Sequence, residues 1–102
     1  MTCNLSTFEL FIIKKLIYDN PRWCNKHISR ENLTRSVPSD KRGECKEVIG
    51  DLARKGFVKL YKSQGRGDIC VPKQRKYQLI GYLKAHREEH YFLQSLDYDR
   101  IR

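Results

Sequence analysis

Apolar residues near the start of the chain recur every three or four positions, as they do on one face of an α-helix. The spacing begins at Phe8 and predicts a helix from about Thr7 to Tyr18. Ser6 and Glu9 have the spacing of a capping box, in which each side chain accepts a hydrogen bond from the other's backbone N–H. Pro21 disfavours a helical residue before it, so the helix must end there.

Two further helices are predicted in the next third of the chain. Ser29 is suited to cap a short helix from about Arg30 to Ser36, and Pro38 then interrupts the chain. Ser39 is suited to cap a third helix, which we expect from Asp40 to about Lys55. Its apolar stripe has the i, i+3, i+4, i+7 spacing and consists of Cys45, Val48, Ile49 and Leu52.

An alternating pattern follows the third helix. Gly56 supplies the left-handed conformation that ends many helices. Apolar and polar residues then alternate from Phe57 to Lys62, which predicts a strand with Val58 and Leu60 on its inner face. Residues 76–80 alternate in a similar way and are expected to form a second strand that pairs with the first.

Positive charge is concentrated in the middle of the chain. The formal net charge is +9, but residues 1–40 carry six Lys/Arg against four Asp/Glu, and residues 81–102 carry four against four. Residues 41–80 carry eleven against four. A local basic surface of this kind can neutralise phosphates and release counterions, which sequence-independent affinity for nucleic acid requires. A charged surface that only confers solubility is the alternative.

Two helices separated by a three-residue turn, the second with a basic start, form the helix-turn-helix pattern. Here the chain resembles the winged-helix family, in the form found in small prokaryotic and archaeal transcriptional regulators. Leu52-Ala-Arg-Lys-Gly56-Phe-Val58 is similar to the family's signature at the join between recognition helix and wing. The resemblance covers about residues 5–80. It implies an α+β winged helix-turn-helix fold with a three-helix core, a small antiparallel sheet with a long wing, and an extra C-terminal helix.

The resemblance also implies how the remaining segments are used. Lys26–Ile28 would be a short first strand. Ser63–Arg75, with two glycines, one proline and four charged residues, would be the long wing. The single domain would then consist of a DNA-binding part, residues 1–80, and a C-terminal helix within residues 81–102.

The candidate DNA-binding residues lie on the third helix and on the expected wing. Arg42 is expected to recognise a guanine, because arginine can bridge O6 and N7, and Lys46 lies one turn away. Ser39 and Lys41 would meet phosphate together with the exposed amides of the helix start. The candidate contacts of the wing to a neighbouring strand or the minor groove are Arg66, Lys73 and Arg75.

The outward face of the third helix carries two glycines, Gly43 and Gly50. Each costs about 1 kcal/mol relative to alanine in a helix. Close approach of this face to a DNA backbone would explain them, and a locally loose helix is the alternative.

The last segment, Tyr82–Leu96, is charge-balanced and predicted to be helical with a broad apolar face. That face would either pack on the first helix of its own chain or pair with a second copy. We expect a homodimer through residues 82–96, because two half-sites bound by a two-fold dimer increase specificity for DNA.

The remaining residues indicate little chemistry. The four cysteines are isolated in sequence, so we expect them to be reduced rather than paired in disulfides. His86 and His90 could share a metal ion, but no third ligand is evident, so no metal or cofactor is expected. No catalytic motif is present, and an enzyme is not expected. Without an apolar span or an export signal, the cytoplasm is the expected location.

The sequence therefore predicts double-stranded DNA binding by a transcriptional regulator. The contacts would come from a recognition helix at about residues 40–55 and a basic wing at residues 63–75. A winged-helix adaptor that binds protein or RNA is the alternative. No small-molecule effector can be identified from the sequence.

Overall fold

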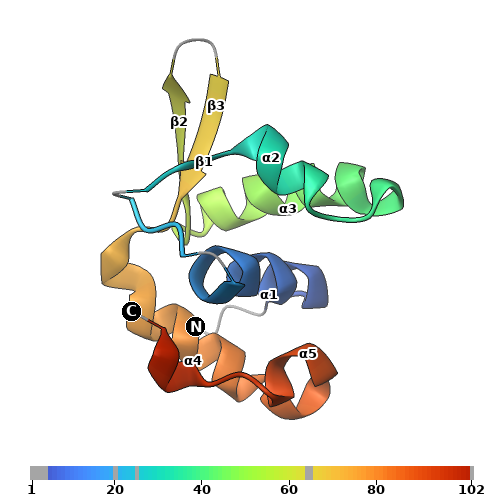
Figure 1. Ribbon diagram of the computed structural model, residues 1–102, viewed down its shortest axis with the longest axis vertical. Helices are drawn as coiled ribbons and strands as arrows, with labels where there is room; N and C mark the ends of the chain where they lie inside the picture. The colour runs from blue at the N-terminus through green and yellow to red at the C-terminus, as the bar shows by residue number, and fades with distance from the viewer. Residues whose placement is uncertain (1–4, 20, 25, 64–65, 102) are drawn as a thin grey trace.

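Helices and a small antiparallel sheet make up an α+β fold (Figure 1). The computed structural model describes residues 5–19, 21–24, 26–63 and 66–101. For Ser63 and Arg66 it describes the backbone and not the side chain. A β-hairpin projects at one end, α2 and α3 lie beside its base, α1 crosses the middle, and the C-terminal helices lie on the far side. The helices are α1 (Thr7–Lys14, continued by a π-helical turn at Lys15–Asp19), α2 (Arg30–Arg35), α3 (Arg42–Arg54), α4 (Lys76–Ala85) and α5 (Tyr91–Gln94).

The first helix begins with the capping box that its sequence predicts. The Glu9 N–H donates to Ser6 Oγ at 3.1 Å, and the Ser6 N–H donates to Glu9 Oε1 at 2.9 Å. The second carboxylate oxygen of Glu9 accepts from Lys55 Nζ at 2.7 Å, which joins the start of α1 to the end of α3. The helix is buried on most sides between α3 and α4, with Leu10, Ile12, Ile13, Leu16 and Ile17 almost completely inaccessible.

The second and third helices follow the predicted pattern except at one cap. Ser29 Oγ accepts from the Asn32 N–H at 3.0 Å, so Ser29 is the expected N-cap of α2. Ser39 does not cap α3: a 3₁₀ turn at Ser39–Lys41 comes first, and α3 begins at Arg42 without a side-chain cap. The predicted apolar stripe is confirmed, because Cys45, Val48, Ile49 and Leu52 are all buried.

Gly56 ends α3 in the left-handed conformation that the sequence predicts, with φ of 80°. The Phe57 N–H then donates to the Leu52 carbonyl at 3.0 Å, which satisfies an orphan acceptor of the last turn. Phe57 and Val58 are buried directly after this bend, so the chain enters the sheet already packed on the core.

The described strands form one antiparallel sheet in the order β1-β3-β2. They are β1 (Ile28–Ser29), β2 (Lys59–Ser63) and β3 (Arg66–Cys70). Ile69, in the middle strand, lies opposite both Ile28 and Leu60 and is fully buried. A strand from the first third of the chain is thereby fixed beside a hairpin from the last half.

The long wing expected at residues 63–75 and the strand expected at residues 76–80 are both wrong. β3 begins at Arg66, three positions after β2 ends, and residues 76–80 are the first half of α4. The apolar alternation in that stretch is too short to distinguish a strand from a helix. Leu79 and Leu83 lie one helical turn apart and are both fully buried, so the helical spacing determines the structure.

The single helix expected over residues 82–96 is also wrong. α4 ends at Ala85, a 3₁₀ turn covers Arg87–Glu89, and α5 is a separate short helix. The bend lets both Leu83 and Leu93 reach the core, where each is fully buried. The expected boundary between residues 80 and 81 therefore falls inside α4.

The C-terminal segment packs within its own chain. This is the arrangement that the sequence analysis gave as the alternative to pairing with a second copy. The Phe92 ring meets the Phe11 ring of α1 edge-on, with centroids 5.7 Å apart. The Tyr98 hydroxyl donates to the Leu93 carbonyl at 2.9 Å and ties the last turn to α5. None of the helices that the structure describes combines the length and apolar character needed to cross a membrane.

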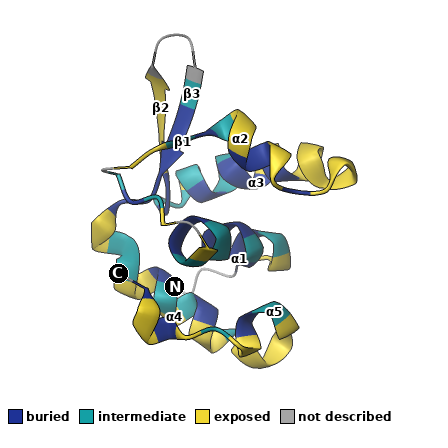
Figure 2. Ribbon diagram, viewed as in Figure 1, coloured by how far each residue is buried: buried dark blue, intermediate teal, exposed yellow. Residues whose placement is uncertain are grey.

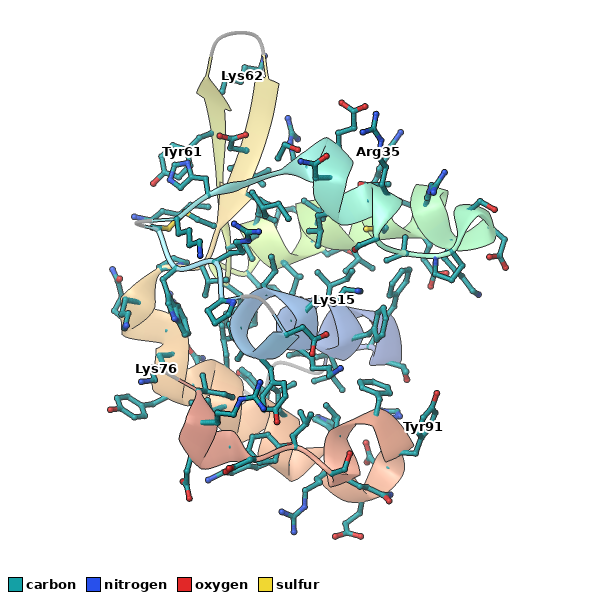
Figure 3. The ribbon with its side chains drawn as sticks, viewed as in Figure 1. Lys15, Arg35, Tyr61, Lys62, Lys76 and Tyr91 are labelled. Carbon is teal, nitrogen blue, oxygen red and sulfur yellow. A yellow bond between two sulfur atoms is a disulfide. The ribbon has the colours of Figure 1, made fainter. Side chains whose placement is uncertain are left out.

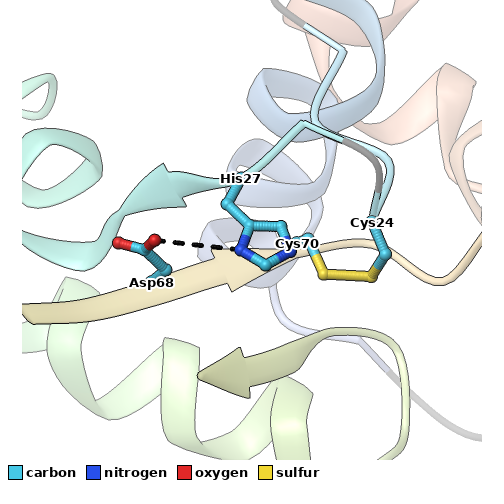
Figure 4. Close-up of a disulfide and its surroundings, with 4 residues drawn as sticks. All are labelled: Cys24, His27, Asp68 and Cys70. Carbon is cyan, nitrogen blue, oxygen red and sulfur yellow. Dashed lines mark ion pairs between the residues drawn. A yellow bond between two sulfur atoms is a disulfide. The ribbon is translucent and has the colours of Figure 1, made fainter. Parts of the chain in front are cut away.

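Cys24 and Cys70 form a disulfide, contrary to the expectation that the cysteines are reduced (Figure 4). Trp23, which is 7% exposed, forms a parallel bridge with Val71, and this places Cys24 beside the end of β3. The two cysteines are 46 residues apart in sequence, so no local spacing marks the pair. Cys45 is free and fully buried, and burial raises the pKa of its thiol.

The disulfide should contribute measurably to stability. Because it closes a loop of 46 residues, reduction should lower the free energy of unfolding by about 2–4 kcal/mol. Urea denaturation with and without dithiothreitol measures the difference. The variant C24S/C70S serves as control, since its midpoint should not respond to the reductant. An equal midpoint for the wild type under both conditions would contradict the prediction.

Candidate nucleic-acid interface

A concave surface lies where α2, α3 and β3 meet. It encloses about 640 Å³. Among the described residues that line it, four carry a positive charge and one a negative charge. They are Arg30, Glu31, Thr34, Arg35, Arg42, Lys46, Ile49 and Gly67, and we call this surface the basic hollow.

The α2 side of the basic hollow is held by polar contacts within the helix. Thr34 is buried, and its hydroxyl donates to the Arg30 carbonyl at 2.7 Å. Glu31 and Arg35 form an exposed ion pair one turn apart. An exposed pair of this kind contributes little to stability, so Arg35 can exchange Glu31 for an external anion at small cost.

The α3 side supplies Arg42 and Lys46, which the sequence places along one flank of the helix. Both side chains are exposed, whereas the stripe from Cys45 to Leu52 is buried. Within the part of the chain that the structure describes, neither side chain has a hydrogen bond or an ion pair. Two cations are therefore presented to solvent with no internal anion to neutralise them.

The hairpin forms the remaining wall. Lys62 lies opposite Gly67 in the register of β2 and β3, so its side chain is on the same face of the sheet as the basic hollow. Figure 3 shows Lys62 and Arg35 on the hairpin side of the molecule, whereas Lys76 and Tyr91 lie on the other side. Arg66 begins β3, and its side chain lies outside the described residues.

Ser39 and Lys41 lie at the turn before α3 and do not line the basic hollow. Both are exposed. Lys41 Nζ stands 3.9 Å from Glu44 Oε2, and both residues border a second, more apolar hollow of about 390 Å³. The rest of its lining is Thr7, Phe8, Phe11, Pro38 and Phe92.

Lys73 and Arg75 are also away from the basic hollow, because the segment expected as a wing leads into α4 instead. Lys73 Nζ lies 5.3 Å from the centre of the Trp23 ring, a cation–π contact. Arg75 Nη1 donates to Gln78 Oε1 at 2.9 Å within the first turn of α4. Both cations thus cover the end of the sheet from which α4 leaves.

Sequence reasoning missed Arg30 and Arg35. The net charge of α2 is small, because Glu31 lies between the two arginines. The excess of Lys and Arg that marks residues 41–80 is therefore not seen in α2. The position of Arg30 depends on the pairing of β1 with β3, which joins segments 40 residues apart. Only a correct sheet order could have placed Arg30 beside the hairpin.

The opposite face of the sheet carries a compact polar cluster beside the disulfide (Figure 4). His27 Nδ1 lies 3.8 Å from Asp68 Oδ2, and Asp68 is 4% exposed. The His27 ring stacks on Tyr61, with centroids 4.7 Å apart and planes 15° apart. Together with Cys24–Cys70, these contacts bind the loop before β1 to the hairpin.

The two histidines considered for a metal ion have other partners. His86 Nδ1 lies 2.6 Å from Glu89 Oε2, and this hydrogen bond lowers the pKa of the Glu89 carboxyl. His90 precedes α5, with Nε2 at 3.5 Å from Thr7 Oγ1. Within the described ranges, no three His, Cys, Asp or Glu side chains are grouped so that they could hold a metal ion.

No known family model, curated protein sequence or solved structure matches this chain. The assignment of function therefore depends on the surface itself. What distinguishes the basic hollow is a set of cations from two separate helices, α2 and α3, that converge on one concavity beside the hairpin.

The two glycines of α3 can be tested directly. A Cβ added to Gly43 would meet nothing within 4 Å, and one added to Gly50 would meet only Arg54 Nη1 at 3.6 Å. Gly50→Ala should therefore raise the free energy of unfolding by about 0.5–1 kcal/mol, measured by urea denaturation. Gly43→Ala should raise it less, because it lies in the first turn. A loss of stability in Gly50→Ala would contradict the prediction.

The same variants separate the two explanations of these glycines. If a DNA backbone approaches the helix closely, Gly43→Ala should weaken duplex binding while the fold is at least as stable as before. If the helix is only locally loose, binding should be unchanged.

Proposed function

We propose that this chain is a winged-helix protein that binds double-stranded DNA as a transcriptional regulator. The order helix, strand, helix, helix, strand, strand supports this reading, with β2 and β3 as a shorter wing than the sequence suggested. The observation that carries the proposal is the basic hollow. Its cations Arg30, Arg42 and Lys46 have no anionic partner among the described residues.

Each wall of the hollow has a role in the proposal. The N-terminal half of α3 enters the major groove, where Arg42 bridges guanine O6 and N7. Arg35 on α2 and Lys62 on the hairpin bind phosphates on either side of the groove. Phosphate contacts orient the protein, and Arg42 supplies the discrimination between bases.

The site of action implied by DNA binding is the cytoplasm. Disulfides are rare there, except in proteins of hyperthermophiles and in redox-responsive proteins, so the proposal requires Cys24–Cys70 to be a disulfide of one of these two kinds. A winged-helix adaptor for protein or RNA is the competing function, and the apolar hollow beside Phe8, Phe11 and Phe92 is the surface that favours it.

Two double variants with equal loss of charge test the interface. R42A/K46A should weaken binding to a short duplex by at least tenfold, because each good base or phosphate contact is worth about 1–3 kcal/mol. K73A/R75A removes two charges outside the basic hollow and should change affinity much less. Fluorescence anisotropy over a salt series measures both affinity and its salt dependence.

The comparison has clear opposing outcomes. Equal weakening by both double variants would mean that net charge alone attracts the DNA. Absence of duplex binding by the wild type at low salt would overturn the regulator and favour the adaptor. A larger effect of Arg42→Ala on a selected sequence than on random duplex would mark Arg42 as the base-contacting residue.

The homodimer through residues 82–96 stays a prediction. The apolar residues behind it pack in the chain's own core, Leu93 fully and Phe92 in part, while Tyr91 is 86% exposed. Light scattering at micromolar concentration should give twice the monomer mass of 12.2 kDa. Tyr91→Asp should halve that mass without unfolding, because Tyr91 is largely exposed and its described ring contact is with its neighbour Phe92. A monomer mass for the wild type would remove the dimer.

A further inference from the structure

We propose that Gly67 and Arg30 act as a pair that binds one phosphodiester of the duplex, with Gly67 positioning the arginine and Arg30 making the contact. The inference rests on the proposed function and adds a residue outside the expected recognition helix and wing. It starts from an observation about space: a Cβ added to Gly67 would overlap the guanidinium group of Arg30.

The two residues come together through the sheet. Arg30 is the first residue of α2 and directly follows Ser29, whose partner in the sheet is Asp68. Gly67 is the neighbour of Asp68 in β3. The pairing of β1 with β3 therefore delivers the Arg30 side chain to the backbone of β3 at the position that lacks a side chain.

The guanidinium occupies the space that a side chain at 67 would need. A Cβ built on Gly67 would lie 2.5 Å from Arg30 Nε and 2.7 Å from its Cζ, well inside contact distance. Gly67 is not among the described glycines with positive φ, of which Gly56 is the one example, so its backbone does not itself require glycine. The space for Arg30 is the requirement that the structure gives for glycine at this position.

The arginine held in this way has no internal partner. No hydrogen bond, ion pair or ring contact engages its side chain within the described part of the chain, although it is only partly exposed. It lines the basic hollow together with Arg42 and Lys46. The guanidinium thus packs against the backbone of β3, and its N–H donors have no partner among the described residues.

These donors suit a phosphate better than a base. The planar guanidinium offers two parallel N–H groups that match two phosphate oxygens. Packing against β3 restricts the side chain before binding, so less rotamer entropy is lost when the anion is bound. The hairpin wall on this side follows the DNA backbone, whereas α3 occupies the groove. A contact from Arg30 should therefore be independent of base sequence.

A double-mutant cycle tests the pair. Arg30→Ala should weaken binding to random and to selected duplexes alike, by about tenfold, and lower the salt slope by about 0.9, the value for one phosphate. Gly67→Ala should displace the arginine and weaken binding in the same direction. In the R30A background, Gly67→Ala should have no further effect, because the residue that it displaces is gone.

Two controls separate this result from general damage. Gly81→Ala introduces a Cβ that meets nothing within 4 Å, and Arg87→Ala removes one exposed charge far from the basic hollow. Both should leave duplex affinity unchanged. The thermal midpoint of Gly67→Ala should stay at or above that of the wild type, since alanine fits a strand at least as well as glycine.

The outcomes distinguish the pair from the proposed function. If the wild type binds duplex but Gly67→Ala is silent, or its effect adds to that of Arg30→Ala, the pair is overturned and DNA binding stands. A larger effect of Arg30→Ala on the selected sequence than on random duplex would overturn the phosphate contact in favour of a base contact. If the wild type binds no duplex, the proposed function fails, and the pair fails with it.

Discussion

The pairing of β1 with β3 is the interaction on which the arrangement of this molecule depends. Two residues, Ile28 and Ser29, pair with Ile69 and Asp68, and they join the helical first half of the chain to the hairpin of the second. Because α2 starts at the next residue, its position relative to the hairpin is determined by this pairing. The concavity between α2, α3 and β3 exists only while β1 keeps its place. The disulfide Cys24–Cys70 and the bridge from Trp23 to Val71 secure the same junction from the other side of the sheet.

The local elements of the first half could be predicted because their signals are local. The capping box at Ser6 and Glu9, the cap at Ser29 and the buried stripe of α3 involve residues three to seven positions apart. Three further features could not be predicted in this way. The place of β1 beside β3, the disulfide and the site of Arg30 each depend on contacts across about 40 residues, and no spacing rule covers that range. Residues 76–80 were predicted to be a strand because five residues fit both the two-residue spacing of a strand and the spacing of a helix. The burial of both Leu79 and Leu83, one helical turn apart, shows the helical spacing.

The candidate interface was predicted in part for the same reason. Arg42 and Lys46 lie where the helical wheel of α3 puts them, along one flank of the helix beside the buried stripe. Lys73 and Arg75 were assigned to a wing that ends earlier, and the structure uses them at the start of α4 instead. Arg30 and Arg35 of α2 line the basic hollow, where Lys73 and Arg75 do not reach. The basic surface therefore combines cations of α2 and α3 with Lys62 of the hairpin, and does not come from one continuous basic segment. The charge-balanced C-terminal segment covers the opposite side of α1 and leaves this surface open (Figure 2).

Mapping the surface that a short DNA duplex touches would test the central claim most directly. A titration of the ¹⁵N-labelled protein with a random-sequence duplex, followed by amide chemical shifts, reports on every element at once. The largest changes should fall on α2, on the first half of α3 and on β2 and β3, with α4 and α5 unaffected. Changes centred on α4 and α5, or no changes at low salt, would contradict a DNA-binding role for the basic hollow.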